Sequence, residues 1–228
     1  MASEQTETTA PSPGQGGLKL EYLHPIEPSS PARVEMLTDG IFAVAATILI
    51  LDVKVAPISH AISAGQFSDA VIALWPKLTV FFCSFITLGR LWEMHRYIFH
   101  LLERCDQKLL FWNTLALAFA CCLPFSTSVA GEYPHFSLAA AIYAVNMLAL
   151  NLVYRGLWYH ASHGDYLLKA DINPAIRKAV MRRFNVYFVL TTAALVLAYF
   201  SSVLSIALIV LHQLVMFFGQ PLFKGQRV

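Results

Sequence analysis

Long apolar runs restrict the possible folds of this chain more than any other feature of its sequence. The hydrophobic residues gather in stretches close to the ~20 residues that a helix needs to cross a bilayer. Hydrophobic residues make up 57% and charged residues 13% of the 228 residues, whereas soluble domains contain about 45–50% apolar and about 25% charged residues. We therefore predict an all-α, polytopic membrane protein in contact with the lipid bilayer.

Residues 31–54 have the pattern of a helix that begins near water and continues into a membrane. Two serines precede Pro31, which suits the first helical position because its missing N–H is no loss there. Residues 40–51 are apolar apart from Thr47. A period of 3.6 residues predicts one stripe formed by Val44, Thr47, Ile48 and Leu51, and a small-residue packing surface formed by Ala43, Ala45 and Ala46.

Three charged residues, Arg33, Glu35 and Asp39, stand at the entrance of this helix. Charges so close to a bilayer interior are costly unless they are paired. We therefore expect these residues to have a function or a fixed contact.

The remaining apolar runs predict five further helices and one transmembrane domain. The domain layout is a disordered cytoplasmic tail over 1–30, a six-helix domain over 31–220 and a short cytoplasmic tail over 221–228. The later helices are expected at about 70–102, 109–130 (broken near Pro124), 136–160, and 184–211, with a basic connection before residue 184 and a division near Ser201-Ser202 into a fifth and a sixth helix.

The distribution of basic residues predicts the orientation of these six spans. An even number of spans places both termini on one side, and most Lys and Arg residues fall on that side. The opposite side has only Lys54 and Lys77. Because cytoplasmic segments carry the excess of basic residues, we expect a multi-pass protein of the cell membrane with both termini in the cytoplasm.

The start of the first span carries a motif, Arg33-x-x-x-Leu37-Thr38-Asp39-Gly40. It resembles the R-x-x-x-F-S-D signature of the endosomal/lysosomal potassium channel transmembrane protein 175 family and its prokaryotic homologues. Leu37 replaces the aromatic residue and Thr38 the serine, so a hydrophobe and a hydroxyl are retained. Further similar stretches, among them 74–77 and 109–113, extend the resemblance over about residues 31–160.

The resemblance implies a polar network that fixes the first helix against the second. In the family, this network joins the Arg and Asp of the signature to a Trp-x-x-His on the second helix, which Trp92-x-x-His95 matches. The implied members are Arg33, Thr38, Asp39, Trp92 and His95. The alternative is that these residues are interfacial anchors, since Trp and Arg favour that depth.

The resemblance also implies an ion path. In the family, the first helices of four repeats line the pore, and this chain has one six-helix repeat, so a homotetramer is expected. The family's apolar constriction and further lining positions correspond to Val44, Thr47 and Leu51, with Ile48 a weaker candidate. Without the resemblance, these residues would be interpreted as lipid-facing or core positions.

The function that follows is a potassium-permeable cation (leak) channel with an apolar constriction, no cofactor, and K⁺ as the permeant ion. The alternatives are a secondary transporter and a proton-conducting variant of the same architecture. A transporter is disfavoured because no matched pair of Gly/Pro-interrupted helices is evident. A membrane enzyme is disfavoured because no convergent catalytic set lies within the spans.

Other polar residues carry weaker hypotheses. His160 and His163 offer a possible metal pair, although two histidines beside a basic loop are more often solvated. The net charge of +2 gives no indication of a nucleic-acid partner. Interhelical hydrogen bonds are expected from Asn113, Asn146 and Asn151.

Overall fold

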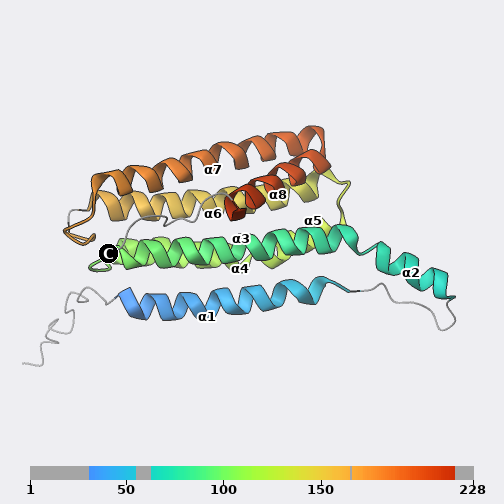
Figure 1. The fold of residues 1–228 in the computed structure, drawn as a ribbon, viewed down its shortest axis with the longest axis horizontal. Helices are drawn as coiled ribbons and strands as arrows, with labels where there is room; N and C mark the ends of the chain where they lie inside the picture. The colour runs from blue at the N-terminus through green and yellow to red at the C-terminus, as the bar shows by residue number, and fades with distance from the viewer. Residues whose placement is uncertain (1–30, 55–62, 165, 219–228) are drawn as a thin grey trace, which may run out of the picture.

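The computed structural model describes residues 31–54, 63–164 and 166–218, which are helical with short connections (Figure 1). The all-α prediction is confirmed for these ranges, which contain helices, an isolated bridge between Leu102 and Leu168, and no named strand. The predicted tails, 1–30 and 221–228, lie outside the described residues. The elements are α1 (Pro31–Leu49), η2 (Ile50–Asp52), α2 (Ala64–Ile72), α3 (Trp75–His100), α4 (Gln107–Cys121), α5 (Leu123–Glu132), α6 (Ser137–His163), α7 (Pro174–Phe200) and α8 (Ser202–Phe218).

Short polar residues and prolines begin the helices. Asp106 caps α4, since its Oδ1 accepts a hydrogen bond of 2.7 Å from the backbone N–H of Leu109. Asn173 caps α7 by accepting from the N–H of Ala175 at 2.8 Å, and Pro174 follows as the first helical residue. Each cap satisfies a backbone donor that the first turn of a helix leaves without a partner.

The second predicted helix, 70–102, corresponds to two helices in the structure and starts at a different residue. The chain becomes helical at Ala64, turns at 73–74 and continues as α3. Pro76 lies in the first turn of α3. Because proline has no N–H and crowds the preceding turn, it does not continue a helix that began earlier, and α2 and α3 are separate elements.

The C-terminal boundary agrees with the predicted division. Ser201 is extended, with φ −158° and ψ 116°, and its Oγ accepts from the N–H of Leu204 at 3.3 Å. The predicted start of the fifth helix at 184 is wrong, because α7 begins at Pro174. The expected basic connection is therefore partly the first turns of α7, which carry Arg177, Lys178, Arg182 and Arg183.

The long helices lie side by side, with α6 in the middle and α1 on the outside (Figure 1). α6 packs against α4, α5, α7 and α8, whereas α1 packs mainly against α3, α4 and α5. The largest fully buried side chains include Trp158, Tyr143, Tyr154 and Met147, all from α6. The hydrophobic core is therefore centred on α6, and α1 covers one side of the bundle.

Four described segments are long and apolar enough to cross a membrane: 65–100, 107–132, 137–163 and 174–200. The segment 202–214 of α8 is apolar but shorter. α1 is 19 residues long and carries Arg33, Glu35 and Asp39 in its first three turns. Length and composition therefore indicate four candidate membrane-spanning segments within the described residues.

Candidate functional site

One face of α1 is exposed along its whole length. The exposed positions of α1 and of the adjoining η2 are 32–33, 36–37, 39–40, 43–44, 47–48 and 50–51, so that each pair follows the last by about one helical turn. Several are large apolar side chains, with exposed fractions of 66% for Met36, 57% for Val44 and 61% for Leu51. No described part of the chain covers this apolar face.

The opposite face of α1 is buried against the bundle. Its buried residues recur with the same period, and they are Val34, Thr38, Phe42, Ala45 and Leu49. The predicted stripe of Val44, Thr47, Ile48 and Leu51 therefore lies wholly on the exposed face. The predicted small-residue surface needs a correction, because Ala43 is exposed and only Ala45 is fully buried.

Thr47 is the polar residue in the apolar part of this exposed face. Its Oγ1 donates a hydrogen bond of 2.8 Å to the backbone carbonyl of Val44, one turn earlier. The hydroxyl proton is then used within the helix, and the free lone pairs of the oxygen remain as acceptors. Oxygen lone pairs of this kind suit a hard cation.

The buried face of α1 is fixed by a polar cluster of three residues, one from each of α1, α3 and α4. The Nε2 of His95 lies 2.9 Å from the Oδ1 of Asn113 and 3.4 Å from the Oγ1 of Thr38. The Nδ2 of Asn113 donates to Thr38 Oγ1 at 3.4 Å. All three side chains are at most 2% exposed. We call this set the Thr38–His95–Asn113 cluster.

The tautomer of His95 follows from these partners. The carbonyl oxygen of Asn113 accepts, so the proton of His95 resides on Nε2. The imidazole also stacks on Phe99, with ring centroids 4.0 Å apart. Buried polar groups that satisfy one another in this way specify one packing arrangement, and here they set the rotation of α1 about its axis.

A second contact ties α1 to α3 nearer the surface. The indole N–H of Trp92 donates to Asp39 Oδ1 at 2.7 Å. The guanidinium of Arg96 lies 5.9 Å from the centre of the Trp92 ring. This contact and the Thr38–His95–Asn113 cluster hold neighbouring positions of the same helix.

The structure brings together four of the five predicted network residues, in two pairs. Thr38 meets His95 and Asp39 meets Trp92, whereas the side chain of Arg33 is exposed. Within the described ranges, no ion pair joins Arg33 to Asp39. Of the residues that the resemblance implies, Arg33 therefore lies apart from these contacts on the exposed side of α1, and Asp39 accepts its hydrogen bond from Trp92.

Asn113 was expected only to make an interhelical bond, not to belong to this network. The sequence signal that could have assigned Asn113 to the network is its position as a polar residue inside the apolar run of α4. The other two predicted asparagines also donate between helices, Asn146 to Ser126 Oγ at 3.0 Å and Asn151 to the carbonyl of Phe184 at 3.3 Å.

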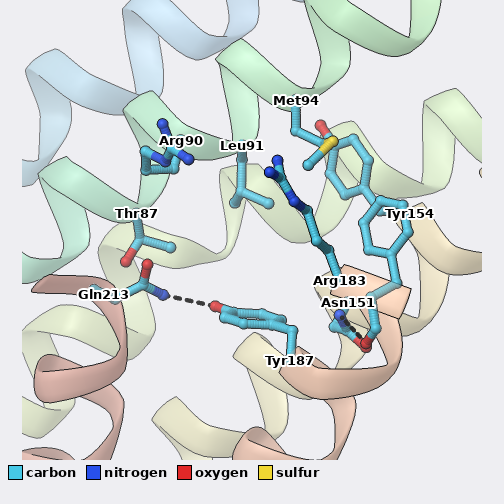
Figure 2. Close-up of a pocket in the computed structure, with 10 residues that line it drawn as sticks. Thr87, Arg90, Leu91, Met94, Asn151, Tyr154, Arg183, Tyr187 and Gln213 are labelled. Atoms are coloured by element: carbon cyan, nitrogen blue, oxygen red, sulfur yellow. Dashed lines mark hydrogen bonds between the residues drawn. The ribbon is translucent and has the colours of Figure 1, made fainter. Parts of the chain in front are cut away.

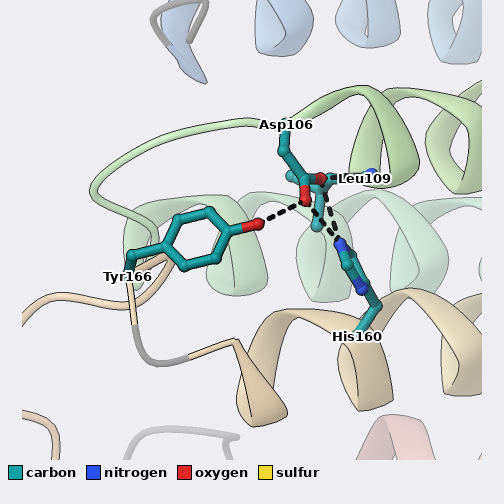
Figure 3. Close-up of polar contacts among 4 residues, drawn as sticks. All are labelled: Asp106, Leu109, His160 and Tyr166. Carbon is teal, nitrogen blue, oxygen red and sulfur yellow. Dashed lines mark hydrogen bonds and ion pairs between the residues drawn. The ribbon is translucent and has the colours of Figure 1, made fainter.

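The histidines at the end of α6 do not form a solvated pair. His160 contacts the carboxylate of Asp106 at 2.8 Å, and Tyr166 donates to the same carboxylate at 3.0 Å (Figure 3). His163 instead stacks on Tyr159, with ring centroids 4.1 Å apart. Among the described residues, no group of three or more metal-ligating side chains is present.

Asp106 is the centre of this contact and joins α4 to α6. Burial by itself raises the pKa of its carboxyl group, but the hydrogen bonds from Leu109, His160 and Tyr166 outweigh burial, so the pKa lies below its ordinary value. The hydrogen bond to Asp106 also raises the pKa of the Tyr166 phenol. The carboxylate therefore remains ionised and holds the connection between α6 and α7 against the start of α4.

These features define a multi-pass helical membrane protein whose first helix is fixed on one side by buried polar contacts and uncovered on the other. The model of the family described as "Endosomal/lysosomal potassium channel TMEM175" matches residues 33–124. A protein named as a potassium channel in Chamaesiphon minutus is 37% identical over 150 residues, which cover 64% of this chain and 73% of that protein. The chain therefore belongs to the TMEM175 family.

Two further comparisons support the fold and the sequence relationship. A crystal structure described as a lysosomal potassium-selective channel TMEM175 homologue from Chamaesiphon minutus superposes with a TM-score of 0.72 at 28% identity, covering 81% of this chain and 94% of that chain. A Danio rerio protein named as an endosomal/lysosomal proton channel is 32% identical over 163 residues, which cover 68% of this chain but 31% of that protein. The family is one of ion channels, not of enzymes.

Proposed function

We propose that this protein is a potassium-permeable cation channel that conducts as a leak through a pore lined by the exposed face of α1. The observation that carries the proposal is the uncovered apolar stripe on a helix whose other face is fixed by buried polar contacts. Its relative from Chamaesiphon minutus is named as a potassium channel. A single chain offers one such face, so we propose that four copies assemble as a homotetramer around a central axis.

Val44 forms the narrowest part of the proposed pore. Four valine side chains facing one axis form an apolar ring, and such a ring opposes ions by excluding water rather than by charge. Thr47 follows one turn later and presents oxygen lone pairs on the same face. Leu51 extends the apolar lining, and Ile48, with an exposed fraction of 41% against 57% for Val44, contributes at its edge.

The polar contacts on the far side of α1 keep this stripe directed at the axis. A rotation of α1 by one residue, about 100°, would break the contacts of both Thr38 and Asp39. The Thr38–His95–Asn113 cluster and the Asp39–Trp92 bond therefore act as positioning contacts. Within this proposal, Arg33 lies on the exposed side at the mouth of the pore.

The proposed topology has six membrane spans: α1, α3, α4 with α5, α6, α7 and α8. Both termini then lie in the cytoplasm, and the cell membrane is the proposed location. The four long apolar segments support four of these spans by composition. α1 and α8 are the other two proposed spans. In the proposed tetramer, neighbouring subunits shield the charged residues at the start of α1 from lipid.

Proton conduction is a second candidate function, because the Danio rerio relative is named as a proton channel. In both cases the same apolar stripe would line the path. The secondary transporter is a less favoured alternative, because no described pair of helices has interruptions at matching positions in two halves of the chain, which a transporter needs.

Single-channel recording from the purified protein in liposomes tests the proposed function. Unitary current steps in potassium chloride are expected, with a reversal potential in potassium–sodium gradients that favours K⁺. Currents carried only under a pH gradient, and absent in symmetrical potassium, would favour the proton channel. Coupled uptake without unitary steps would identify a transporter and overturn the proposal.

Native mass spectrometry tests the assembly separately. The expected species is a tetramer released from detergent. A monomer or dimer that conducts in the same preparation would contradict a pore formed by four copies of α1.

A further inference from the structure

A cavity of about 70 Å³ lies among α3, α6, α7 and α8 (Figure 2). The described residues that line it come from these four helices, and not from α1. The proposed ion path and its positioning contacts therefore make no use of this cavity.

Two guanidinium groups face the cavity from opposite helices. Arg90 belongs to α3 and forms an ion pair with Glu93. Arg183 belongs to α7, and Figure 2 shows its side chain extending across to α3, between Leu91 and the ring of Tyr154. Two cations and one carboxylate leave the cavity with an excess of positive charge. An excess of this kind in an apolar surrounding favours an anion.

Two buried polar atoms that belong to lining residues have no hydrogen-bond partner in the described structure. They are the hydroxyl group of Tyr154 and the Oδ1 of Asn151, from side chains that are 1% and 2% exposed. The amide nitrogen of Asn151 is already used on the carbonyl of Phe184. A buried polar group without a partner is costly and rare in folded proteins. Among the residues that line the cavity, one donor and one acceptor therefore have no hydrogen-bond partner.

The other groups around the cavity restrict the shape of a ligand. Gln213 donates to the hydroxyl of Tyr187 at 2.7 Å, so these two polar groups satisfy each other. Leu91, Met94 and Phe184 form apolar walls. A ligand that suits the site therefore has a small anionic head, a hydroxyl group and an apolar part.

We propose that this cavity binds the phosphate group of an ester that also carries a hydroxyl group. The guanidinium of Arg183 presents a planar set of N–H donors that matches phosphate oxygens, and the hydroxyl of Tyr154 donates to the same group. The Oδ1 of Asn151 accepts from the ligand hydroxyl. The apolar walls favour a phospholipid headgroup, because basic pockets between membrane helices bind such headgroups. A soluble phosphate ester has the same chemistry.

This site is tested by binding to the intact protein in detergent. Phosphatidylglycerol is the lipid probe, phosphatidylcholine is the lipid without net charge or hydroxyl groups, and glycerol phosphate is the soluble probe. Affinities are measured by native mass spectrometry and by the ligand-dependent rise in melting temperature. We expect phosphatidylglycerol to bind more tightly than phosphatidylcholine. Binding of glycerol phosphate with the same sensitivity to substitution would support the chemistry and identify a soluble ligand.

Three substitutions make the test specific. Tyr154→Phe removes a hydroxyl that has no protein partner, so the unliganded protein keeps its stability while the affinity falls by about 10- to 100-fold, the value of a hydrogen bond to a charged group. Arg183→Gln lowers the affinity at least as much. Arg182→Gln is the matched control, because Arg182 precedes Arg183 and carries the same charge on an exposed side chain. We expect Arg182→Gln to change the affinity by less than about twofold.

Any of three results would overturn the proposal. The first is that neither phosphatidylglycerol nor glycerol phosphate binds above the phosphatidylcholine level. The second is that Tyr154→Phe retains the parental affinity, and the third is that Arg182→Gln lowers the affinity as much as Arg183→Gln does. Tyr154→Phe keeps the test decisive if Arg183→Gln does not fold. The measurement does not depend on conduction, so its failure leaves the proposed channel untouched.

Discussion

Asn113→Leu removes the central member of the Thr38–His95–Asn113 cluster without a large change of volume. The substitution leaves His95 Nε2, which is 2.9 Å from Asn113 Oδ1 in the native chain, buried without its best partner. An unpaired buried donor costs about 1–3 kcal/mol. The loss at Thr38 is smaller, since its contacts with both partners are long, at 3.4 Å, and a threonine hydroxyl can bond to its own helix instead. The free energy of unfolding should therefore fall by about 1–3 kcal/mol.

The assay is reversible unfolding in detergent, followed by far-ultraviolet circular dichroism. Thr114→Val is the control, because that exposed neighbour bonds only to a carbonyl of its own helix, and it should change the stability by less than about 0.5 kcal/mol. The double variant with His95→Phe removes both partners together. Its loss should be smaller than the sum of the two single losses, since no donor is left unpaired. Additive losses, or an Asn113→Leu protein as stable as the Thr114→Val protein, would refute the role given to the cluster.

Three further predictions concern parts of the chain away from the proposed pore. The pKa of Asp106 lies below its ordinary value of 3.8, so the carboxylate stabilises the fold fully above pH 3.8 and loses this effect as the pH falls through its folded-state pKa. Asp106→Asn should therefore lower the melting temperature at pH 7 and make the melting temperature fall less steeply in acid. An unchanged dependence of the melting temperature on acid pH would contradict this. Gly156→Ala should destabilise by about 1–3 kcal/mol, because the added Cβ would lie 2.7 Å from the Trp112 ring, whereas Gly89→Ala, which meets nothing within 4 Å, should be neutral or stabilising in the same melts. Burial first, and then the nearby carboxylates, raise the pKa of Cys105 to about 11, so Cys105→Ser should not reduce maleimide labelling of the native protein at pH 7; a lower labelling stoichiometry would show that this thiol is accessible.

Local patterns in the sequence were sufficient to predict the all-helical fold and the phase of α1. The stripe of Val44, Thr47, Ile48 and Leu51 follows from the period of a helix, and all four side chains are exposed in the structure. The boundary near Ser201 was predicted from two adjacent serines within a long apolar run. These features depend on residues close in sequence, where helical geometry leaves few alternatives.

Contacts between distant segments were harder to predict. The hydrogen bonds of Asp106 reach His160 and Tyr166, which are 54 and 60 positions away, and no periodicity connects such residues. The basic residues after residue 174 were interpreted as a connection because they interrupt the apolar pattern. The helix in fact begins before the apolar run, at Pro174. The resemblance grouped Arg33 with Asp39 and Trp92, whereas in the structure Trp92 donates to Asp39 and the side chain of Arg33 is exposed.

The most direct test of the central claim compares two valine substitutions by single-channel recording. Val44 and Val196 are both 57% exposed in the single chain, but only Val44 lies on the proposed pore face. Val44→Asn should hydrate the apolar ring, raise the potassium conductance and shift the bi-ionic reversal potential toward equal permeability for K⁺ and Na⁺. Val196→Asn should leave both quantities at the parental values. Parental currents from Val44→Asn, together with altered currents from Val196→Asn at matched protein density, would contradict a pore lined by α1.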